Sequence, residues 1–483
     1  MLRGTPCPTA RRRGTTRRVP FLTSRSPAVD DALRAVASTP FWLDDPGRPD
    51  AEPPLITGTR TDLAVVGGGF TGLWTALRAK ERDPGRDVLL LEGAWIGWAA
   101  SGRNGGFIDA SLTHGRSNGE LHLPGEVDRL DALGLANLDG LQDSVARYGW
   151  DCDFERTGGL SVATEAYQVD QLRGEPGFLD TAAVRAQVDS PTYLAGVWTR
   201  DDTALVNPAR LCWELKRTCL ELGVRIAEHT PVRHISSADG DVVLRTPGGD
   251  VCARRVALGT NVFPSLLPRY RWHTIPVYDY ALVTEPLSGA QLAAIGWRNR
   301  QGVGDLGNRF HYYRRTADDR VLFGGYDAVY HYGRRLSAEY DQNPDSFRTL
   351  AAHFQQTFPQ LEGVRFTHAW GGAIDTCTRF FPFFGTGHGG RVAHVAGYTG
   401  LGVGMTRFAA DVVLDLLARA EDGPTELTEL ELVRTPPVPF PPEPLAWGGV
   451  EVTTRSLDHA DRHEGQRNVW LRTLDRLGLG FDS

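Results

Sequence analysis

Residues 62–72 read DLAVVGGGFTG, an apolar run that ends in a cluster of glycines. A helical pattern follows, with Leu73, Ala76 and Leu77 at its apolar positions, and a second apolar run, DVLLLE, occupies residues 87–92. Short apolar runs bounded by glycines and turns are typical of strands buried on both faces of a parallel sheet. The stretch therefore predicts a strand–helix–strand unit of about thirty residues.

The glycines between the first strand and the helix have the spacing Gly67-x-Gly69-x-x-Gly72, and Glu92 ends the second strand. Gly67 permits a tight turn, Gly69 leaves room for a pyrophosphate beside the backbone, and Gly72 lets the helix lie close to the strand. The helix N-terminus offers free N–H groups to the phosphates, and Glu92 can accept hydrogen bonds from ribose hydroxyls. Because strand, helix and acid are all present at the required spacing, the pattern predicts dinucleotide binding.

Two further segments favour FAD over NAD. The loop SGRNGG at 101–106 is rich in glycine, which would let backbone approach the edge of a flavin ring; an ordinary glycine loop is the alternative. Near the other end, a strand at 392–397 is followed by YTGLGVG and a helical stripe that begins at Met405. This second module aims another helix N-terminus at the ligand, where it would favour the negative charge of a reduced flavin.

Together with GTN at 259–261, WGGAID at 370–375 and AGYTGLG at 396–402, these motifs resemble those of the FAD-dependent amine and amino-acid oxidoreductases. That group, the D-amino-acid oxidase superfamily, includes glycine oxidase, sarcosine oxidase and γ-glutamylputrescine oxidase. SGRNGG and WGGAID are nearest to the γ-glutamylputrescine oxidase-like branch. The resemblance covers about residues 38–420.

The resemblance implies an α/β fold in which a Rossmann-like FAD-binding domain is interleaved with an antiparallel-sheet substrate domain. The expected divisions are a disordered basic extension at 1–29, an N-terminal arm at 30–60, the FAD domain at 61–111, 200–262 and 367–420, the substrate domain at 112–199 and 263–366, and a proline-rich strap with a C-terminal helix at 421–483.

The residues expected to hold FAD are those of the two glycine modules, the SGRNGG loop and two intervening segments: Gly67, Gly69, Phe70, Thr71, Gly72, Glu92, Ser101, Gly102, Arg103, Asn104, Gly105, Gly106, Val232, Gly259, Thr260, Thr399, Gly400, Leu401 and Gly402. We expect FAD to be bound non-covalently, since Cys377 does not fall where sarcosine oxidase tethers its flavin.

The substrate is expected to contact Tyr280, Tyr313, Trp370 and Asp375. For the two tyrosines, a place on a half-buried sheet face is the alternative. Asp375 could bind a substrate ammonium or cap the local backbone, and Arg103 could pair with a carboxylate.

Enzymes of this kind transfer a hydride from the carbon beside a neutral amine to the flavin N5, and water hydrolyses the resulting imine. The flavin performs the difficult step, so no catalytic base or nucleophile is required, and we assign none. A flavin monooxygenase is a weaker alternative because GTN and GYTG stand where that class would carry Asp-Gly and Gly-Asp. A non-catalytic FAD-binding protein is the other alternative.

Lysine occurs only at Lys80 and Lys216, on the two helices expected to flank the first sheet. Gly404 and Leu401 stand where sarcosine oxidases carry a lysine and many relatives a histidine. A lysine-assisted reaction with dioxygen is therefore not expected, and the electron acceptor is either dioxygen or another molecule.

The chain of 483 residues has a net charge of −7, although residues 1–29 contain seven arginines and no acid. This balance gives no reason to expect nucleic acid as a partner. The basic head lacks the apolar stretch of an export signal, and no apolar run approaches the roughly 18 residues of a membrane span. We therefore expect a cytoplasmic enzyme that acts on a small-molecule amine or amino acid.

No metal site is expected, because the six cysteines form no CxxC pair and HxxxH at 459–463 lacks the adjacent glutamate of a zinc protease. The last segment combines TPPVPFPPEP at 435–444 with one amphipathic helix that carries Trp470, Leu471, Leu474 and Leu477 on one side. Its mixed charge favours docking back onto the enzyme over an oligomer interface or a membrane surface.

Overall fold

The first sheet contains the predicted dinucleotide-binding unit. The computed structural model describes residues 21, 26–238 and 240–479, and in it the strand order of this sheet is β18-β19-β11-β1-β2-β8. All neighbours on this path are parallel except β18 and β19, and β10 and β9 extend β11 as an antiparallel flap. The strands are β1 (Thr59–Val66), β2 (Val88–Leu91), β8 (Arg225–Ala227), β9 (His234–Ala238), β10 (Asp241–Thr246), β11 (Gly249–Leu258), β18 (Phe383–Gly387) and β19 (Val392–Ala396).

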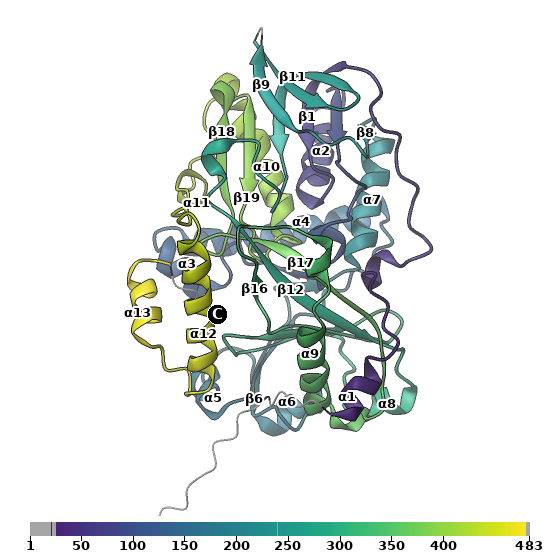
Figure 1. Ribbon diagram of the computed structural model, residues 1–483, viewed down its shortest axis with the longest axis vertical. Helices are drawn as coiled ribbons and strands as arrows, with labels where there is room; N and C mark the ends of the chain where they lie inside the picture. The colour runs from purple at the N-terminus through teal and green to yellow at the C-terminus, as the bar shows by residue number, and fades with distance from the viewer. Residues whose placement is uncertain (1–20, 22–25, 239, 480–483) are drawn as a thin grey trace, which may run out of the picture.

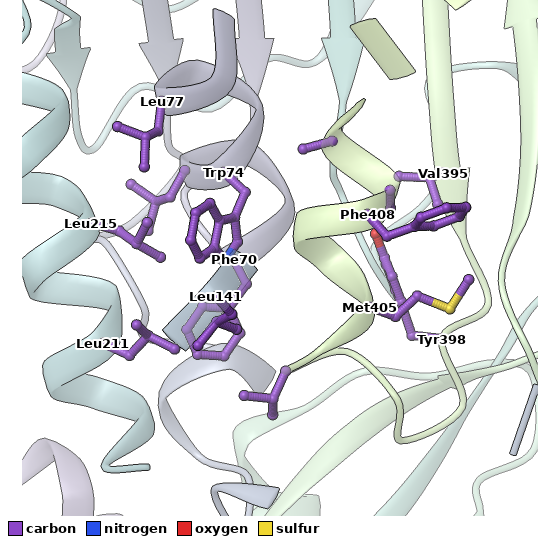
Figure 2. Packing of buried hydrophobic residues seen from close by; sticks show 14 of the residues in the cluster. Phe70, Trp74, Leu77, Leu141, Leu211, Leu215, Val395, Tyr398, Met405 and Phe408 are labelled. Carbon is purple, nitrogen blue, oxygen red and sulfur yellow. The ribbon is translucent and has the colours of Figure 1, made fainter. Parts of the chain in front are cut away.

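The helix between β1 and β2 is buried between two other helices. It is α2 (Phe70–Arg82), and it contacts α7 (Pro208–Glu221) and α10 (Met405–Asp422). In Figure 2, Trp74 and Leu77 of α2 lie beside the leucines of α7. This packing follows from a sequence that is apolar on more than one side of the helix.

The second sheet is mostly antiparallel, with the order β16-β12-β15-β14-β13-β4-β6-β5 and with β17 on the other edge of β12. Figure 1 shows it in the lower half of the molecule, with α9 packed against it. Its strands are β4 (Gly159–Ala163), β5 (Phe178–Leu179), β6 (Ala195–Thr199), β12 (Ile275–Thr284), β13 (Gly302–Asp305), β14 (His311–Arg315), β15 (Val321–Gly325), β16 (Val329–Tyr330) and β17 (Phe366–Thr376). This arrangement confirms the predicted fold class.

Short elements complete the two layers. A small antiparallel pair joins β3 (Phe107–Asp109) to β7 (Thr203–Leu205). The remaining helices that cover the sheets or connect them are α3 (Arg116–His122), α4 (Val127–Tyr148), α5 (Ala166–Leu172), α6 (Thr181–Gln187), α8 (Gly289–Ile295), α9 (Pro344–Thr357) and α11 (Glu431–Arg434). Among the described residues, no helix combines the length and the apolar character that crossing a membrane requires.

One predicted domain boundary is wrong. We expected residues 367–376 in the FAD domain, but β17 pairs antiparallel with β12 over nearly its whole length. The chain returns to the first sheet only at β18, which begins at Phe383. The WGGAID motif (370–375) therefore lies on a strand of the second sheet.

The N-terminal end of the fold begins earlier than expected. Most of the predicted extension at 1–29 lies outside the described residues, but α1 (Pro27–Ala32) starts within it and Val29 is buried. Ser26 caps this helix by accepting a hydrogen bond from the Val29 N–H, and Pro27 occupies the first helical position. The arm that follows contacts the second sheet and the SGRNGG loop: Ala37 bridges to β17, and Trp42 donates from its indole N–H to the Asn104 carbonyl, at 2.9 Å.

The C-terminal segment contains two helices in place of the single one predicted. They are α12 (Leu445–Asp461) and α13 (Val469–Arg476), drawn in yellow along one side of the molecule in Figure 1. The chain reverses between them through positive φ angles at Glu464 and Gly465, and Asn468 caps α13. We refer to residues 436–479 as the C-terminal unit.

Candidate active site

A single cavity of about 1880 Å³ runs from the glycine turn of the first sheet, across the face of the second sheet, to the C-terminal unit. Ligand pockets are commonly about 300–1,000 Å³. The cavity is therefore large enough for a dinucleotide together with a second, smaller molecule.

The glycine turn of the first sheet is shaped by close backbone contacts. Gly67 has φ +109, and a Cβ placed there would lie 2.4 Å from the Gly259 carbonyl oxygen. A Cβ at Gly72 would lie 1.8 Å from the Gly67 oxygen, so only glycine lets α2 approach β1 this closely. Gly69 instead borders the cavity, and a Cβ there would lie 2.7 Å from Ser101 Oγ. These contacts explain why glycine is required at the first and third positions, and pyrophosphate binding beside Gly69 stays a prediction.

Glu92 closes this end of the cavity. Its carboxylate accepts hydrogen bonds from Gly68 N at 2.6 Å, Ala94 N at 2.7 Å and Trp98 Nε1 at 2.9 Å. Burial raises its pKa, and the three donors oppose this effect. The side chain is thus held at the carboxyl end of β2, where a nucleotide ribose is bound in dinucleotide folds.

The SGRNGG loop joins the two sheets. Ser101 Oγ accepts from the Phe70 N–H at the start of α2, at 3.0 Å. The Arg103 carbonyl accepts from the indole of the buried Trp370, at 2.9 Å. A Cβ at Gly105 would lie 2.7 Å from the ring of Tyr312. The loop is therefore clamped between α2 and the cavity face of the second sheet.

The second glycine module contributes the turn before α10. Thr399 and Gly400 adopt φ values of +50 and +102, and the Thr399 carbonyl lies 2.5 Å from His114 Nε2. Asp375 Oδ2 accepts from the Gly397 N–H at 2.6 Å. Burial raises the pKa of Asp375 to about 7. Of the two roles considered for Asp375, its contacts correspond to capping the local backbone.

Two buried oxygens on the cavity wall have no hydrogen-bond partner among the described residues: Thr260 Oγ1 and Asn261 Oδ1. Buried polar groups in folded proteins nearly always form hydrogen bonds. These two oxygens are therefore placed to form hydrogen bonds with the polar groups of a ligand. The glycine turn, Glu92 and these two oxygens together fit the phosphates, ribose and ring system of FAD.

The structure brings most of the predicted cofactor residues to this cavity. Those that line it are Gly67, Gly69, Phe70, Thr71, Glu92, Ser101, Arg103, Asn104, Gly105, Val232, Gly259, Thr260, Thr399, Gly400, Leu401 and Gly402. Val232 does so from the connection between β8 and β9. Gly72, Gly102 and Gly106 do not line the cavity. A Cβ at each would lie 1.8–2.1 Å from a backbone oxygen, so these glycines are required for close backbone packing.

Of the four predicted substrate residues, Trp370, Tyr280 and Asp375 border the cavity and Tyr313 does not. Tyr313 is buried on the opposite face of the sheet, where its hydroxyl lies 2.5 Å from that of Tyr193. The ring of Tyr280 packs against Phe347 on that same face, and its hydroxyl donates to the Tyr340 carbonyl. Both faces of the sheet are buried, so the alternation in HYYRR (311–315) could not reveal which tyrosine faces the cavity.

Sequence reasoning missed Asp279, which faces the cavity as a partner of Tyr312, a residue within the segment 311–314 that the sequence does single out as a candidate for the pocket lining. The Tyr312 hydroxyl donates to Asp279 Oδ2 at 2.7 Å, and the Tyr280 N–H donates to Oδ1 at 2.8 Å. Burial raises the pKa of Asp279 to about 6, and the Tyr312 hydrogen bond partly offsets this effect. An aspartate at the centre of an otherwise apolar strand, IPVYDYALVT, was the available signal.

Comparison with known proteins agrees with this geometry. The family model described as "FAD dependent oxidoreductase" (DAO) matches residues 62–416. The chain belongs to the DAO family of FAD-dependent oxidoreductases. Within this family it is 31% identical over 373 residues to "Gamma-glutamylputrescine oxidoreductase" of Escherichia coli, covering 74% of this chain and 83% of that protein.

One further relative of this DAO-family protein and one solved structure of the same fold define how far the similarity extends. "Probable oxidoreductase OrdL" of Haemophilus influenzae is 28% identical over 396 residues, covering 78% of this chain and 87% of the relative. The solved structure of glycine oxidase from Geobacillus kaustophilus superposes with a TM-score of 0.63 at 21% identity, covering 78% of this chain and 99% of that one. The family match ends at residue 416, before the C-terminal unit begins.

Proposed function

We propose that this oxidoreductase oxidises the C–N bond of a small amine or amino acid to an imine, which water then hydrolyses. The observation that supports this reaction is the Asp279–Tyr312 pair, which lies on the cavity wall beside the SGRNGG loop. A similar sequence, the γ-glutamylputrescine oxidoreductase, and a similar structure, the glycine oxidase, are named for substrates of the same class.

Bound FAD supplies the hydride acceptor for this reaction. In our proposal the cofactor is held by the glycine turn that begins at Gly67, by Glu92, by the SGRNGG loop and by the turn before α10. Asp279 receives the substrate nitrogen: a carboxylate has about four lone-pair sites, and the protein uses three of them. The bound ammonium passes one proton to this carboxylate, which leaves the neutral amine required for hydride transfer. The indole of Trp370 closes the wall behind Arg103 and helps to exclude water.

We propose further that FAD is bound without a covalent tether. Cys377 borders the cavity, but its thiol contacts the carbonyls of Phe381 and Gly397. Burial raises the pKa of the thiol, which keeps it protonated and a poor nucleophile. Acid precipitation should therefore release all flavin into the supernatant, and yellow colour retained in the pellet would contradict this proposal.

Reoxidation of the flavin is proposed to proceed without a lysine, with dioxygen or another acceptor. Lys80 donates to the carbonyls of Pro84 and Arg86, and Lys216 pairs with Glu228 at 2.6 Å. Neither lysine borders the cavity. Mixing the substrate-reduced enzyme with dioxygen measures the reaction directly, and peroxide formation would identify dioxygen as the acceptor.

The decisive experiment for the reaction is anaerobic mixing of the purified flavoenzyme with amines, N-alkyl amino acids and D-amino acids. Bleaching of the flavin absorbance near 450 nm, with release of ammonia or an amine and a carbonyl product, is expected for at least one of them. A flavin bleached only by a reduced nicotinamide cofactor would indicate a monooxygenase, and a flavin bleached by neither would indicate a non-catalytic binding protein.

A further inference from the structure

We infer that the substrate is an amine whose far end is apolar and carries no carboxylate, and that the C-terminal unit forms the wall that selects it. This inference rests on the proposed function, because it takes the cavity as the place where the amine is oxidised. It goes further by stating the chemical class of the rest of the substrate.

The first observation concerns the cations of the cavity. Within the described residues, the lining contains three arginines and no lysine, and each arginine is paired with a carboxylate of the protein. Arg103 Nη1 lies 2.5 Å from Asp341, Arg309 pairs with Asp327 and Asp458, and Arg467 makes a two-point contact with Asp475 at 2.6 and 2.8 Å. The positive charge of each arginine is thus already balanced by an acid of the protein, so a substrate carboxylate would gain little from pairing with it.

The second observation is that the cavity does offer an acidic group to a cation. In the described part of the chain, the hydrogen bonds to the Asp279 side chain come from the Tyr312 hydroxyl and the backbone N–H groups of Tyr280 and Gly325, and no ion pair to it is found. The charged group that affects it from the neighbouring strands is Asp327, which is also acidic. The site is therefore complementary to an ammonium group at one end, whereas the arginines of the described lining are already paired with acids of the protein.

The third observation is the chemistry of the wall opposite the second sheet. The C-terminal unit lines the cavity with apolar side chains: Val450, Leu457, Trp470, Leu471, Leu474 and Leu479. Gly448 and Gly449 widen the space, since a Cβ at either would meet no atom within 4 Å. Such a wall stabilises alkyl or aryl groups and penalises a charged group that loses its hydration.

The wall and Asp279 are connected through neighbouring elements that border the cavity. The helix α12 contacts β16, and β16 pairs with β12 at Val277 and Tyr278, immediately before Asp279. Asp327, which influences Asp279, also pairs with Arg309, and Arg309 pairs with Asp458 of α12. This chain of contacts leads from the proposed ammonium site to the apolar wall.

The end of α12 is held firmly enough to define a pocket. Asp461 accepts hydrogen bonds from Asn308 N at 2.9 Å, from Asn308 Nδ2 at 2.6 Å and from Arg309 N at 3.1 Å. At the other end, Glu443 accepts from the Tyr330 hydroxyl and the Gly333 N–H. The docking of this segment back onto the enzyme, expected from its mixed charge, thus positions it over the cavity.

The test compares two amines that differ only in the far end. Both 2-methylheptan-2-amine and 6-amino-6-methylheptanoate have a nitrogen-bearing carbon without hydrogen, so neither can be oxidised, and calorimetry on the FAD-loaded enzyme measures binding alone. We expect the first to bind at least tenfold more tightly. Equal affinity, or tighter binding of the carboxylate, would overturn the inference whether or not the enzyme oxidises amines.

The same comparison with oxidisable compounds uses hexylamine, 6-aminohexanoate and 1,6-diaminohexane, scored by the anaerobic rate of flavin bleaching. We expect the second-order rate constant of flavin reduction to be at least tenfold higher for hexylamine than for either charged analogue. If no compound of any class bleaches the flavin while the binding preference holds, the proposed reaction is wrong and the inference about the cavity stands.

Variants of α13 test whether the wall is responsible. Leu474→Arg places a cation at a cavity-lining position, whereas Leu477→Arg, three residues later, places it at a position that is 63% exposed and not part of the lining. We expect Leu474→Arg to weaken binding of 2-methylheptan-2-amine at least fivefold and to strengthen that of the carboxylate. Leu477→Arg should change neither, and equal effects in the two variants would contradict the assignment of the wall.

Discussion

At Asp279, burial and a hydrogen bond act in opposite directions on the charge of one side chain. Burial raises the pKa to about 6, and the Tyr312 hydroxyl lowers it towards the ordinary value. An ammonium substrate needs the ionised form, so binding should weaken as the pH falls through about 6. In Tyr312→Phe the opposing hydrogen bond is lost, and the midpoint of this pH dependence should rise by about half a pH unit to one pH unit.

The measurement is the pH dependence of the dissociation constant of 2-methylheptan-2-amine. In Asp279→Asn the acidic limb should disappear and affinity at pH 8 should fall at least tenfold. Asp341→Asn is the matched control: this carboxylate pairs with Arg103, so the midpoint should stay near 6. A midpoint that is the same in wild type, Tyr312→Phe and Asp279→Asn would exclude Asp279 as the group that binds the amine.

The ionisation of Asp279 also affects folding, with a defined sign. The pKa of this carboxyl rises from 3.8 to about 6 on folding, so its ionisation is less favourable in the folded protein than in the unfolded chain. The free energy of unfolding therefore decreases between pH 4 and 6 and stays constant at higher pH. Asp279→Asn should therefore raise the free energy of unfolding at pH 8 by up to about 3 kcal/mol and change it little at pH 4. Thermal unfolding at both pH values, without amine, measures this difference.

At the scale of elements, the contact between β1 and α2 depends on glycine. Gly72→Ala would force a methyl group to 1.8 Å from the Gly67 oxygen, which requires the helix to move away from the strand. We expect a loss of about 3 kcal/mol or more of stability and weakened FAD binding, measured by denaturant unfolding and flavin fluorescence. Gly289→Ala, at the start of α8 where a Cβ meets nothing, is the control and should be neutral.

The position of the C-terminal unit depends on Asp461. Removal of its carboxylate in Asp461→Ala leaves two N–H groups of the β13–β14 connection without partners, so α12 and α13 should open locally. Hydrogen exchange should speed up in residues 445–476 while the protection of β1 and α2 stays unchanged. Glu451→Ala, which removes only an exposed pair with Arg455, should not alter the exchange. Uniform acceleration throughout the chain would instead indicate general destabilisation.

At the scale of the whole molecule, the cofactor is expected to join the two sheets. The SGRNGG loop reaches from α2 to the second sheet, and the cavity is lined by both. FAD at about 100 times its dissociation constant should add about 2.7 kcal/mol to stability, because it binds only the folded protein. The melting temperature should rise with FAD concentration and stay constant with NAD. A rise with NAD alone would contradict the cofactor assignment.

The sequence was sufficient to predict those elements whose structure depends on a local pattern of residues and on backbone geometry. The apolar runs around Gly67 and Gly69 predicted β1, α2 and β2 because a pyrophosphate turn requires glycine at fixed spacing. Glu92 followed from the same spacing. The resemblance of the motifs then led to the fold class and the FAD-dependent family, both of which the comparisons confirm.

Prediction failed where side chains far apart in the chain had to be placed on one face. Tyr312 and Tyr313 are neighbours, and a shift of one residue exchanges the two faces of a strand. Which tyrosine meets the cavity was decided by the pairing of β14 with β13 and β15. The placement of Asp375 as a backbone cap was likewise decided by a turn 22 residues later in the chain.

The sequence by itself determined the cofactor-binding unit of this protein, because its glycines and its acid act within one short strand–helix–strand segment. Only the tertiary structure decided what the rest of the cavity presents. It brought Asp279 and the distant C-terminal unit (436–479) to one cavity and paired each cavity arginine with an acid of the protein. The charge and polarity of a cavity depend on which distant groups neutralise each other, and no local pattern encodes that balance.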